Sequence, residues 1–300
     1  MIDQHGRTRL RRTMMLTPGN QEQRLLKAAT LDVDAVIFDL EDGVGPDMKA
    51  EARRTVAQTL ESVDFGWRER LVRINAVDTD DFDRDIENLP YGSFDTVFVP
   101  KVESATQLIK LDRMLSDIEL SQQRPQPIEI IATIETPRGL FNALAIADAS
   151  PRTTALFFGS GDYSAATGGS LTKDALAFAR GTIVAAAAAA GLQAIDAAYF
   201  AAVKDAEATA ADARLAKELG FAGKVVFHPN QLAVCNEIFS PSASELERAH
   251  RIVEAHRAAA AEGRGVAYVE GEFLAIDIVL MAKRIIRQAN LVARRTEQTS

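Results

Sequence analysis

The chain has 300 residues, of which 47% are hydrophobic, and a formal net charge of -8. A chain of this length can bury a large core, and α/β barrels of this size form one domain. The acidic balance argues against general nucleic-acid binding, which needs a basic surface to neutralise phosphates. The single cysteine, Cys235, excludes an internal disulfide and a thiolate metal site.

The sequence favours a cytoplasmic protein that does not bind membranes. No apolar stretch is long enough for a membrane span, and the N-terminus is not followed by a signal-peptide core. A local basic cluster comprises Arg7, Arg9, Arg11 and Arg12. It is either part of a flexible, solvated terminus, which we place at residues 1–11, or a site for an anionic substrate tail.

Eight short apolar runs alternate with helical patterns along the chain. The runs cover residues 14–16, 35–38, 71–74, 96–99, 128–134, 155–158, 192–195 and 224–227. The clearest helical patterns cover residues 22–30, 49–60, 105–115, 175–190 and 206–219. Short, uniformly apolar runs are typical of parallel strands that are covered on both faces. Eight strand–helix units predict an α/β fold, a closed (β/α)8 TIM barrel over residues 12–239.

Residues 240–300 are expected to form a C-terminal helical extension. Ser244 is the expected N-cap of its first helix, with Glu247 completing a capping box. A second helix is expected from about residue 273 to 292. These helices either pack on the barrel or reach a neighbouring subunit.

Two carboxylates each follow a buried apolar run. Glu135 ends the run in IIATIETPRG, and Asp162 follows the run in ALFFGSGDYS. The carboxyl ends of barrel strands converge on one mouth, so both acids are expected there. Magnesium prefers oxygen ligands and keeps several waters, so two carboxylates suffice to hold it. Alternatively, Glu135 caps the next helix and Asp162 stabilises a turn.

Further polar residues follow the other predicted strands. Arg73 among several acids suits a small carboxylate or oxo-acid held by paired hydrogen bonds. Asp39, Glu41 and Asp42 crowd negative charge, which requires a cation or hydrogen-bond donors. They either support the metal through bound water or pair with local amides while Asp47 caps the next helix. The remaining strand-end residues are Thr17, Asn75, Lys101, Glu103, Asp196 and His228, the last of which suits a rigid turn better than a base.

Taken in order, these segments resemble the citrate lyase beta-subunit-like family of the HpcH/HpaI aldolase superfamily, which includes malyl-CoA and citramalyl-CoA lyases. The likeness runs from about Arg12 to Arg284. It includes RTMMLTPG, FDLEDGVGPDMKAEAR, VRIN, VPKVES, IETPRG, FGSGDY, GKVVFHPNQL and FSPSASE. The resemblance implies a (β/α)8 barrel, a magnesium-dependent acyl-CoA site and a homo-oligomer, commonly a trimer or a dimer of trimers.

The resemblance also implies roles for individual residues. Glu135 and Asp162 would hold Mg²⁺, and Arg73 would bind the oxo-acid. Gly161 stands where the family often places Glu, and would let backbone amides approach the substrate carboxylate. The segment around Arg12 could meet the CoA tail.

The implied reaction is an aldol- or Claisen-type carbon–carbon cleavage. Its expected substrate is a short hydroxy-dicarboxylic acyl-CoA such as malyl-CoA or citramalyl-CoA. The oxo-acid partner belongs to the glyoxylate, pyruvate or oxaloacetate class.

One position departs from the family. Its late general-acid Asp, offered from a neighbouring subunit, aligns with Ala275 in VEGEFLAIDIVLMAKRII. Asp277, Glu272 or a water molecule are the possible substitutes. The alternatives are therefore an oxo-acid aldolase or an acyl-CoA thioesterase with the same metal site, or a non-catalytic metabolite-binding homologue.

Overall fold

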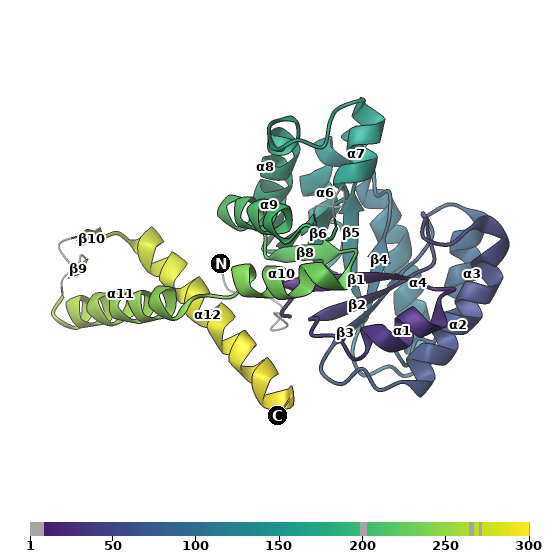
Figure 1. Cartoon of the computed structure of the whole chain (residues 1–300), viewed down its shortest axis with the longest axis horizontal. Helices are drawn as coiled ribbons and strands as arrows, with labels where there is room; N and C mark the ends of the chain where they lie inside the picture. The colour runs from purple at the N-terminus through teal and green to yellow at the C-terminus, as the bar shows by residue number, and fades with distance from the viewer. Residues whose placement is uncertain (1–8, 199–202, 264–266, 270–271, 300) are drawn as a thin grey trace. The chain divides into compact units, whose positions relative to one another are not determined.

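A computed structural model describes residues 9–198, 203–263, 267–269 and 272–299 (Figure 1). Eight parallel strands form a closed barrel in which each strand pairs with the next and β8 pairs with β1. The strands are β1 Thr13–Pro18, β2 Ala35–Asp39, β3 Glu69–Arg73, β4 Thr96–Val99, β5 Glu129–Ile134, β6 Thr153–Phe158, β7 Gln193–Ala197 and β8 Gly223–Val226. The predicted TIM barrel is confirmed, and every predicted strand overlaps an observed one.

Helices connect the strands and cover the barrel. In chain order they are α1 Glu22–Ala28, η1 Pro46–Met48, α2 Lys49–Ser62, α3 Asp80–Asn88, α4 Ala105–Ser121, α5 Pro137–Phe141, α6 Ala143–Ala147, α7 Ser160–Thr167, α8 Lys173–Ala190, α9 Ala206–Leu219, η2 Pro229–Gln231 and α10 Leu232–Phe239. Local sequence sets several of their ends. Thr172 caps the start of α8 by accepting the amide of Ala175, and Gly191 ends α8 in the left-handed conformation.

Alternation along the strands sorts side chains into an inner and an outer set. The inner set forms an apolar middle layer of Met14, Ile37, Leu71, Phe98, Ile131, Ala155, Ile195 and Val225. Further inner positions above this layer, at the carboxyl ends of the strands, are occupied by Asp39, Arg73 and Glu135. The barrel is therefore a packed core with a polar layer at one end.

Arg11 closes the opposite end of the barrel. Its guanidinium binds Glu69 through Nε and Nη2, both at 2.7 Å, and Glu129 through Nη2 at 2.8 Å. Arg12 is also buried and pairs with Asp34 at 2.8 Å. These partners lie at the amino ends of β2, β3 and β5. Two expectations are therefore wrong: Arg11 does not belong to a solvated terminus, and Arg12 does not lie at the mouth to meet a CoA tail.

The chain divides into two compact units, of which the barrel unit spans Arg11–Asn236. The other contains α11 Ala243–Ala261, the antiparallel pair β9 Ala267–Val269 and β10 Glu272–Leu274, and α12 Ile276–Thr299. We call it the C-terminal unit. It has its own apolar cluster, which includes Ala249, Ile252 and Val279.

Two expected helix starts in the C-terminal unit are wrong. The capping box of α11 uses Ser242 and Glu245, because the helix begins at Ala243 and both reciprocal bonds form there, at 2.7 and 3.1 Å. Phe273 lies in β10 opposite Tyr268, with ring centroids 5.9 Å apart, so α12 begins only at Ile276.

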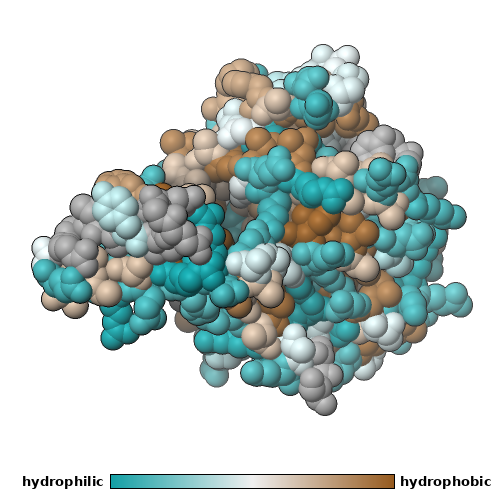
Figure 2. Space-filling view, turned by 60° about the vertical axis from the view of Figure 1, so that its left-hand side comes forward, coloured by the Kyte–Doolittle hydropathy of each residue, from teal (hydrophilic) through white to brown (hydrophobic). Residues whose placement is uncertain are grey.

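None of the described helices is both long and apolar enough to cross a membrane. Hydrophilic side chains cover much of the face in Figure 2, with hydrophobic areas between them.

Candidate active site at the barrel mouth

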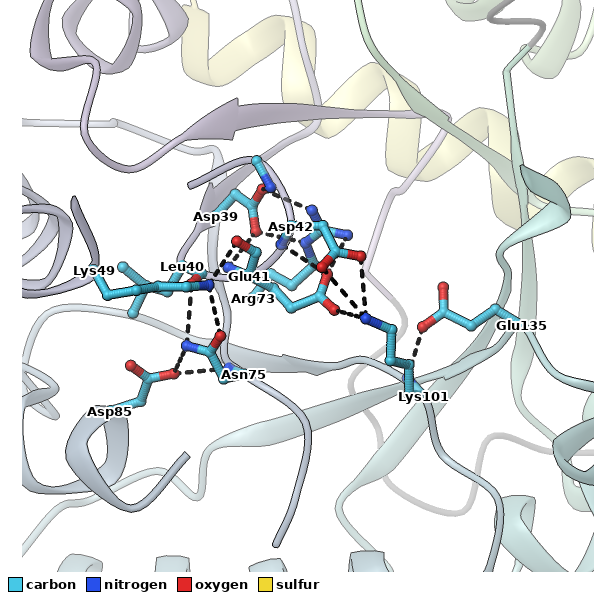
Figure 3. A network of polar contacts seen from close by, with 11 residues as sticks. Asp39, Leu40, Glu41, Asp42, Lys49, Arg73, Asn75, Asp85, Lys101 and Glu135 are labelled. Carbon is cyan, nitrogen blue, oxygen red and sulfur yellow. Dashed lines mark hydrogen bonds and ion pairs between the residues drawn. The ribbon is translucent and has the colours of Figure 1, made fainter. Parts of the chain in front are cut away.

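Asp39 and Arg73 form a bidentate ion pair at the mouth (Figure 3). Arg73 Nε and Nη2 donate to the two carboxylate oxygens of Asp39, each at 2.6 Å, and Nη1 lies 3.1 Å from Glu41 Oε2. Burial alone would lower the pKa of Arg73, but the hydrogen bonds and charges of Asp39, with the charge of Glu41, raise it. The guanidinium is therefore a permanent cation in a fixed orientation.

Local amides hold the acidic loop after β2. Asp39 accepts the N–H groups of Glu41 at 2.8 Å and Gly43 at 2.9 Å. A side chain at Gly43 would collide with the Asp39 carboxylate, so the loop needs glycine there. Asp47 does not act as a helix cap, because the N-cap residues are Gly45 for η1 and Met48 for α2.

Lys49 ties this loop to the outer helices. Its ammonium donates to the carbonyls of Leu40 and Glu41, at 2.6 and 2.7 Å, and to Asn75 Oδ1 at 2.7 Å. Asn75 in turn donates to Asp85 at 2.7 Å through both its backbone and its side chain. The backbone carbonyls of Leu40 and Glu41 are thus held by hydrogen bonds to Lys49, which is itself held by Asn75 (Figure 3).

Lys101 links the acidic loop to Glu135. Its backbone N–H donates to Glu135 Oε1 at 2.7 Å, and its ammonium binds Glu41 at 2.5 Å and Asp42 at 3.1 Å. Its φ of 51° is in the left-handed region, which is uncommon for a residue with a side chain. Burial alone would lower the pKa of Lys101, but Glu41 and Asp42 outweigh it and raise the pKa.

Glu135 and Asp162 are neighbouring acids at the mouth. Glu135 is 3% exposed, and burial, followed by the charge of Asp162, raises its pKa to about 8. Asp162 lies exposed in the first turn of α7. Glu135 does not cap a helix, because Thr136 is the N-cap of α5. A side chain at Gly159 would press on Glu135, so a glycine after β6 makes room for it.

This donor set fits a hard divalent cation. Burial of Glu135 and repulsion from the Asp162 carboxylate both favour a proton on Glu135, and a cation between the two acids would relieve the repulsion. Among the described residues, no group of three or more His, Cys, Asp or Glu side chains is placed to hold a metal. Substrate and water oxygens would therefore complete the coordination.

Gly161 lies in the first turn of α7, next to Asp162. The first amides of a helix have no partner within it, so this turn offers donors to an anion. The Gly161 amide is one of the amides of this turn.

Three strand-end or buried residues belong to structural groups. Asp196 is fully buried and faces outward from β7, where Lys224 binds it at 2.6 Å. It is not at the mouth, because Ile195 and Ala197 occupy the inner face. His228 accepts the Asn230 amide through Nδ1 and caps η2, which supports the turn interpretation. Cys235 is buried, which raises its pKa to about 11.

The profile of the family described as HpcH/HpaI aldolase/citrate lyase matches residues 12–229. The chain belongs to this family. It is 36% identical over 284 residues to a (3S)-malyl-CoA thioesterase of Cereibacter sphaeroides, covering 94% of this chain and 95% of the relative. It is 34% identical over 285 residues to the citrate lyase subunit beta of Leuconostoc mesenteroides, covering 94% of each. The resemblance found in the motifs is thus confirmed.

A solved structure supports the fold assignment. The protein CitE from Mycobacterium tuberculosis, in complex with magnesium, acetoacetate and coenzyme A, has a TM-score of 0.75 and 34% sequence identity to this chain. The match covers 93% of this chain and 97% of that one. Family members thus include citrate lyase subunits and thioesterases, and a similar barrel binds magnesium and coenzyme A.

The sequence analysis placed Lys101 among the strand-end residues without assigning it a role, and it did not select Lys49 or Gly159. Lys101 follows β4 directly, so the strand-end rule that selected Glu135 also reaches it. Lys49 lies on the first turn of α2, and only its distance to the loop carbonyls shows its role. Ala275, where the sequence departs from the family motif, lies just before α12. Asp277 is exposed in the first turn of that helix. The side chain of Glu272 is outside the described residues.

Proposed function

We propose that the protein is a magnesium-dependent carbon–carbon lyase for a short hydroxy-dicarboxylic acyl-CoA, such as malyl-CoA or citramalyl-CoA. The carrying observation is the buried Glu135, near the charge of Asp162 and at the same mouth as the fixed cation Arg73. Magnesium bound by Glu135 and Asp162 would supply a Lewis acid for the oxo-acid oxygens.

Arg73 has the hydrogen-bond capacity to hold the oxo-acid. A guanidinium carries five N–H donors, and Arg73 uses three of them on Asp39 and Glu41. The remaining two can bind a carboxylate of the glyoxylate, pyruvate or oxaloacetate class. Asp39 and Glu41 orient Arg73, and Asp42 holds Lys101, so these acids support the cations of the site. The amides of Glu41 and Gly43 that Asp39 accepts agree with the local-amide alternative for Asp39, and support of the metal through bound water stays a prediction for these acids.

Glu135 and the first turn of α7 complete the oxo-acid site. The Lys101 amide fixes one oxygen of Glu135, and the charge of Asp162 acts on the same carboxyl group. The amide of Gly161 would then bind the substrate carboxylate. The relative that contains magnesium, acetoacetate and coenzyme A supports this ligand class.

Proton transfer decides between the lyase and its alternatives. In the cleavage direction a base takes the substrate hydroxyl proton, the carbon–carbon bond breaks, and its electron pair enters the thioester as an enolate, which is then protonated. Ala275 has no group to transfer a proton. A malyl-CoA thioesterase among the relatives favours hydrolysis as the second candidate.

We also propose that the protein is a cytoplasmic homo-oligomer, a trimer or a hexamer. Each unit exposes apolar side chains of its own: Phe141 and Phe178, 6.5 Å apart, in the barrel unit, and Tyr268 and Met281 in the C-terminal unit. A second copy of the chain is the proposed partner for these surfaces. Light scattering that gives a monomer at micromolar concentration would contradict the assembly.

Calorimetry with the variants Glu135→Ala and Asp162→Ala tests the function. Both should abolish magnesium-dependent binding of pyruvate or glyoxylate, while Glu61→Ala, an exposed acid on α2, should bind normally. Turnover of malyl-CoA and citramalyl-CoA, followed by release of oxo-acid or of free thiol, separates cleavage from hydrolysis. Unchanged magnesium-dependent binding in both variants would refute the assignment, and binding without any turnover would support a non-catalytic homologue.

A further inference from the structure

The mouth contains a second cation with spare hydrogen-bond capacity. An ammonium has three N–H donors. Lys49 uses all three, on Leu40, Glu41 and Asn75. Lys101 uses one on Glu41 and shares another between the two oxygens of Asp42, at 3.1 and 3.3 Å. Counting acceptors in the described part of the chain, one N–H of Lys101 therefore remains for a ligand.

The position of Lys101 suits a ligand contact. Its side chain is 40% exposed, whereas the side chain of Arg73 is 14% exposed. Figure 3 shows the ammonium between the acidic loop and Glu135. Lys49, by contrast, reaches backbone carbonyls behind that loop. Lys101 is thus a cation that a substrate can reach from the mouth.

The backbone of Lys101 is fixed independently of its ammonium. A left-handed conformation at a residue with a side chain is strained and persists only where the surroundings enforce it. Here the Lys101 amide is held by Glu135, and the next amide, of Val102, donates to the Thr133 carbonyl at 3.1 Å. Removing the ammonium should therefore leave the orientation of Glu135 intact.

The proposed reaction develops negative charge on the thioester fragment as well as on the oxo-acid. Arg73 and the acidic pair would bind the oxo-acid, but the thioester oxygen of the other fragment also becomes negative when the enolate forms. We propose that the Lys101 ammonium donates a hydrogen bond to this enolate oxygen, which makes Lys101 a catalytic residue for an acyl thioester. This inference rests on the proposed lyase function.

The step can be written for the condensation direction. Solvent takes a proton from the carbon next to the thioester carbonyl, and the released electron pair forms a carbon–carbon double bond. The carbonyl electrons move to oxygen, which accepts the N–H of Lys101. Return of a proton from solvent restores the thioester, so in deuterium oxide the acyl group gains deuterium without any carbon–carbon bond forming.

Deuterium uptake by acetyl-CoA or propionyl-CoA, measured by mass spectrometry with Mg²⁺ present, therefore tests Lys101. Lys101→Met should slow the exchange by about 10²–10³-fold, the effect typical of losing one oxyanion donor. Lys101→Arg keeps the charge and should restore part of the rate. Lys110→Met is the matched control, because Lys110 on α4 pairs with the exposed Asp78 and its loss should change nothing.

Magnesium-dependent pyruvate binding by calorimetry separates catalysis from positioning. Lys101→Met should bind pyruvate as the parent protein does, because the amide that holds Glu135 remains. Exchange at the parent rate in Lys101→Met would overturn the inference while leaving the lyase function standing. An equal loss of exchange and pyruvate binding would also overturn it, because Lys101 would then only position Glu135. A parent protein with neither exchange nor turnover would refute the proposed lyase itself.

Discussion

Gly159→Ala should displace Glu135, one of the two proposed metal ligands, although the substitution itself replaces no charged residue. A β-carbon at Gly159 would lie 2.6 Å from the Glu135 β-carbon and 2.5 Å from Oε2. Carbon atoms normally approach to about 3.5–4.0 Å, so Glu135 must move by roughly 1 Å. Overpacking of this kind costs about 1–3 kcal/mol of folding free energy. A displacement of about 1 Å in a reacting group lowers the rate by roughly 100-fold.

The assay combines thermal unfolding with calorimetric titration of Mg²⁺ in the presence of pyruvate. Gly181→Ala is the matched control, because a β-carbon at that helical position on α8 meets nothing within 4 Å. Since alanine is a better helix former than glycine, this variant should gain about 0.5–1 kcal/mol and bind normally. Normal magnesium-dependent binding by Gly159→Ala, with unchanged stability, would refute the assignment of Gly159 as the space for Glu135.

Two further predictions concern buried charge. Arg11→Met removes the guanidinium that pairs with the buried Glu69 and Glu129, so urea unfolding should show a loss of about 3–5 kcal/mol, with pyruvate binding by the folded protein unchanged. A much smaller loss would mean that Arg11 does not stabilise the closed end of the barrel. With metal chelated, burial and the charge of Asp162 raise the pKa of Glu135 in the folded protein from 4.5 to about 8. Between these values the folded protein holds a proton on Glu135 that the unfolded chain has lost. The stability that this proton contributes is therefore fully present below about pH 4.5 and is lost as the pH rises to about 8. Saturating Mg²⁺ or Glu135→Gln should remove that pH dependence in urea unfolding, and its persistence in Glu135→Gln would assign it to another group.

The fold was predictable because its signal is local and repeated. Each strand is a short apolar run, and eight of them separated by helices leave few alternatives to a closed barrel. Helix ends were less predictable where two cap patterns compete. Both Ser242 and Ser244 are followed three residues later by Glu, and only the three-dimensional structure shows that the first pair closes the capping box.

The position of the charged residues was predictable only in part. Glu135 and Asp162 were found because a strand end fixes the rim of the barrel that a residue occupies. The same rule failed for Asp196. A strand end identifies the rim of the barrel but not the face of the strand, and the Asp196 side chain lies on the outer face, where it pairs with Lys224. Arg11 looked like part of a flexible basic terminus, and its acceptors lie 58 and 118 residues further along the chain.

The sequence by itself determined the barrel, the acidic pair and the arginine opposite it, because short periodic patterns and ordered motifs encode them directly. Only the tertiary structure decided how those charges are used. It assigned Asp39 to Arg73, brought the amide of Lys101 to Glu135, and left the ammonium of Lys101 with a spare donor. Hydrogen bonds and buried ion pairs depend on distances between residues far apart in the chain, and folding alone sets those distances.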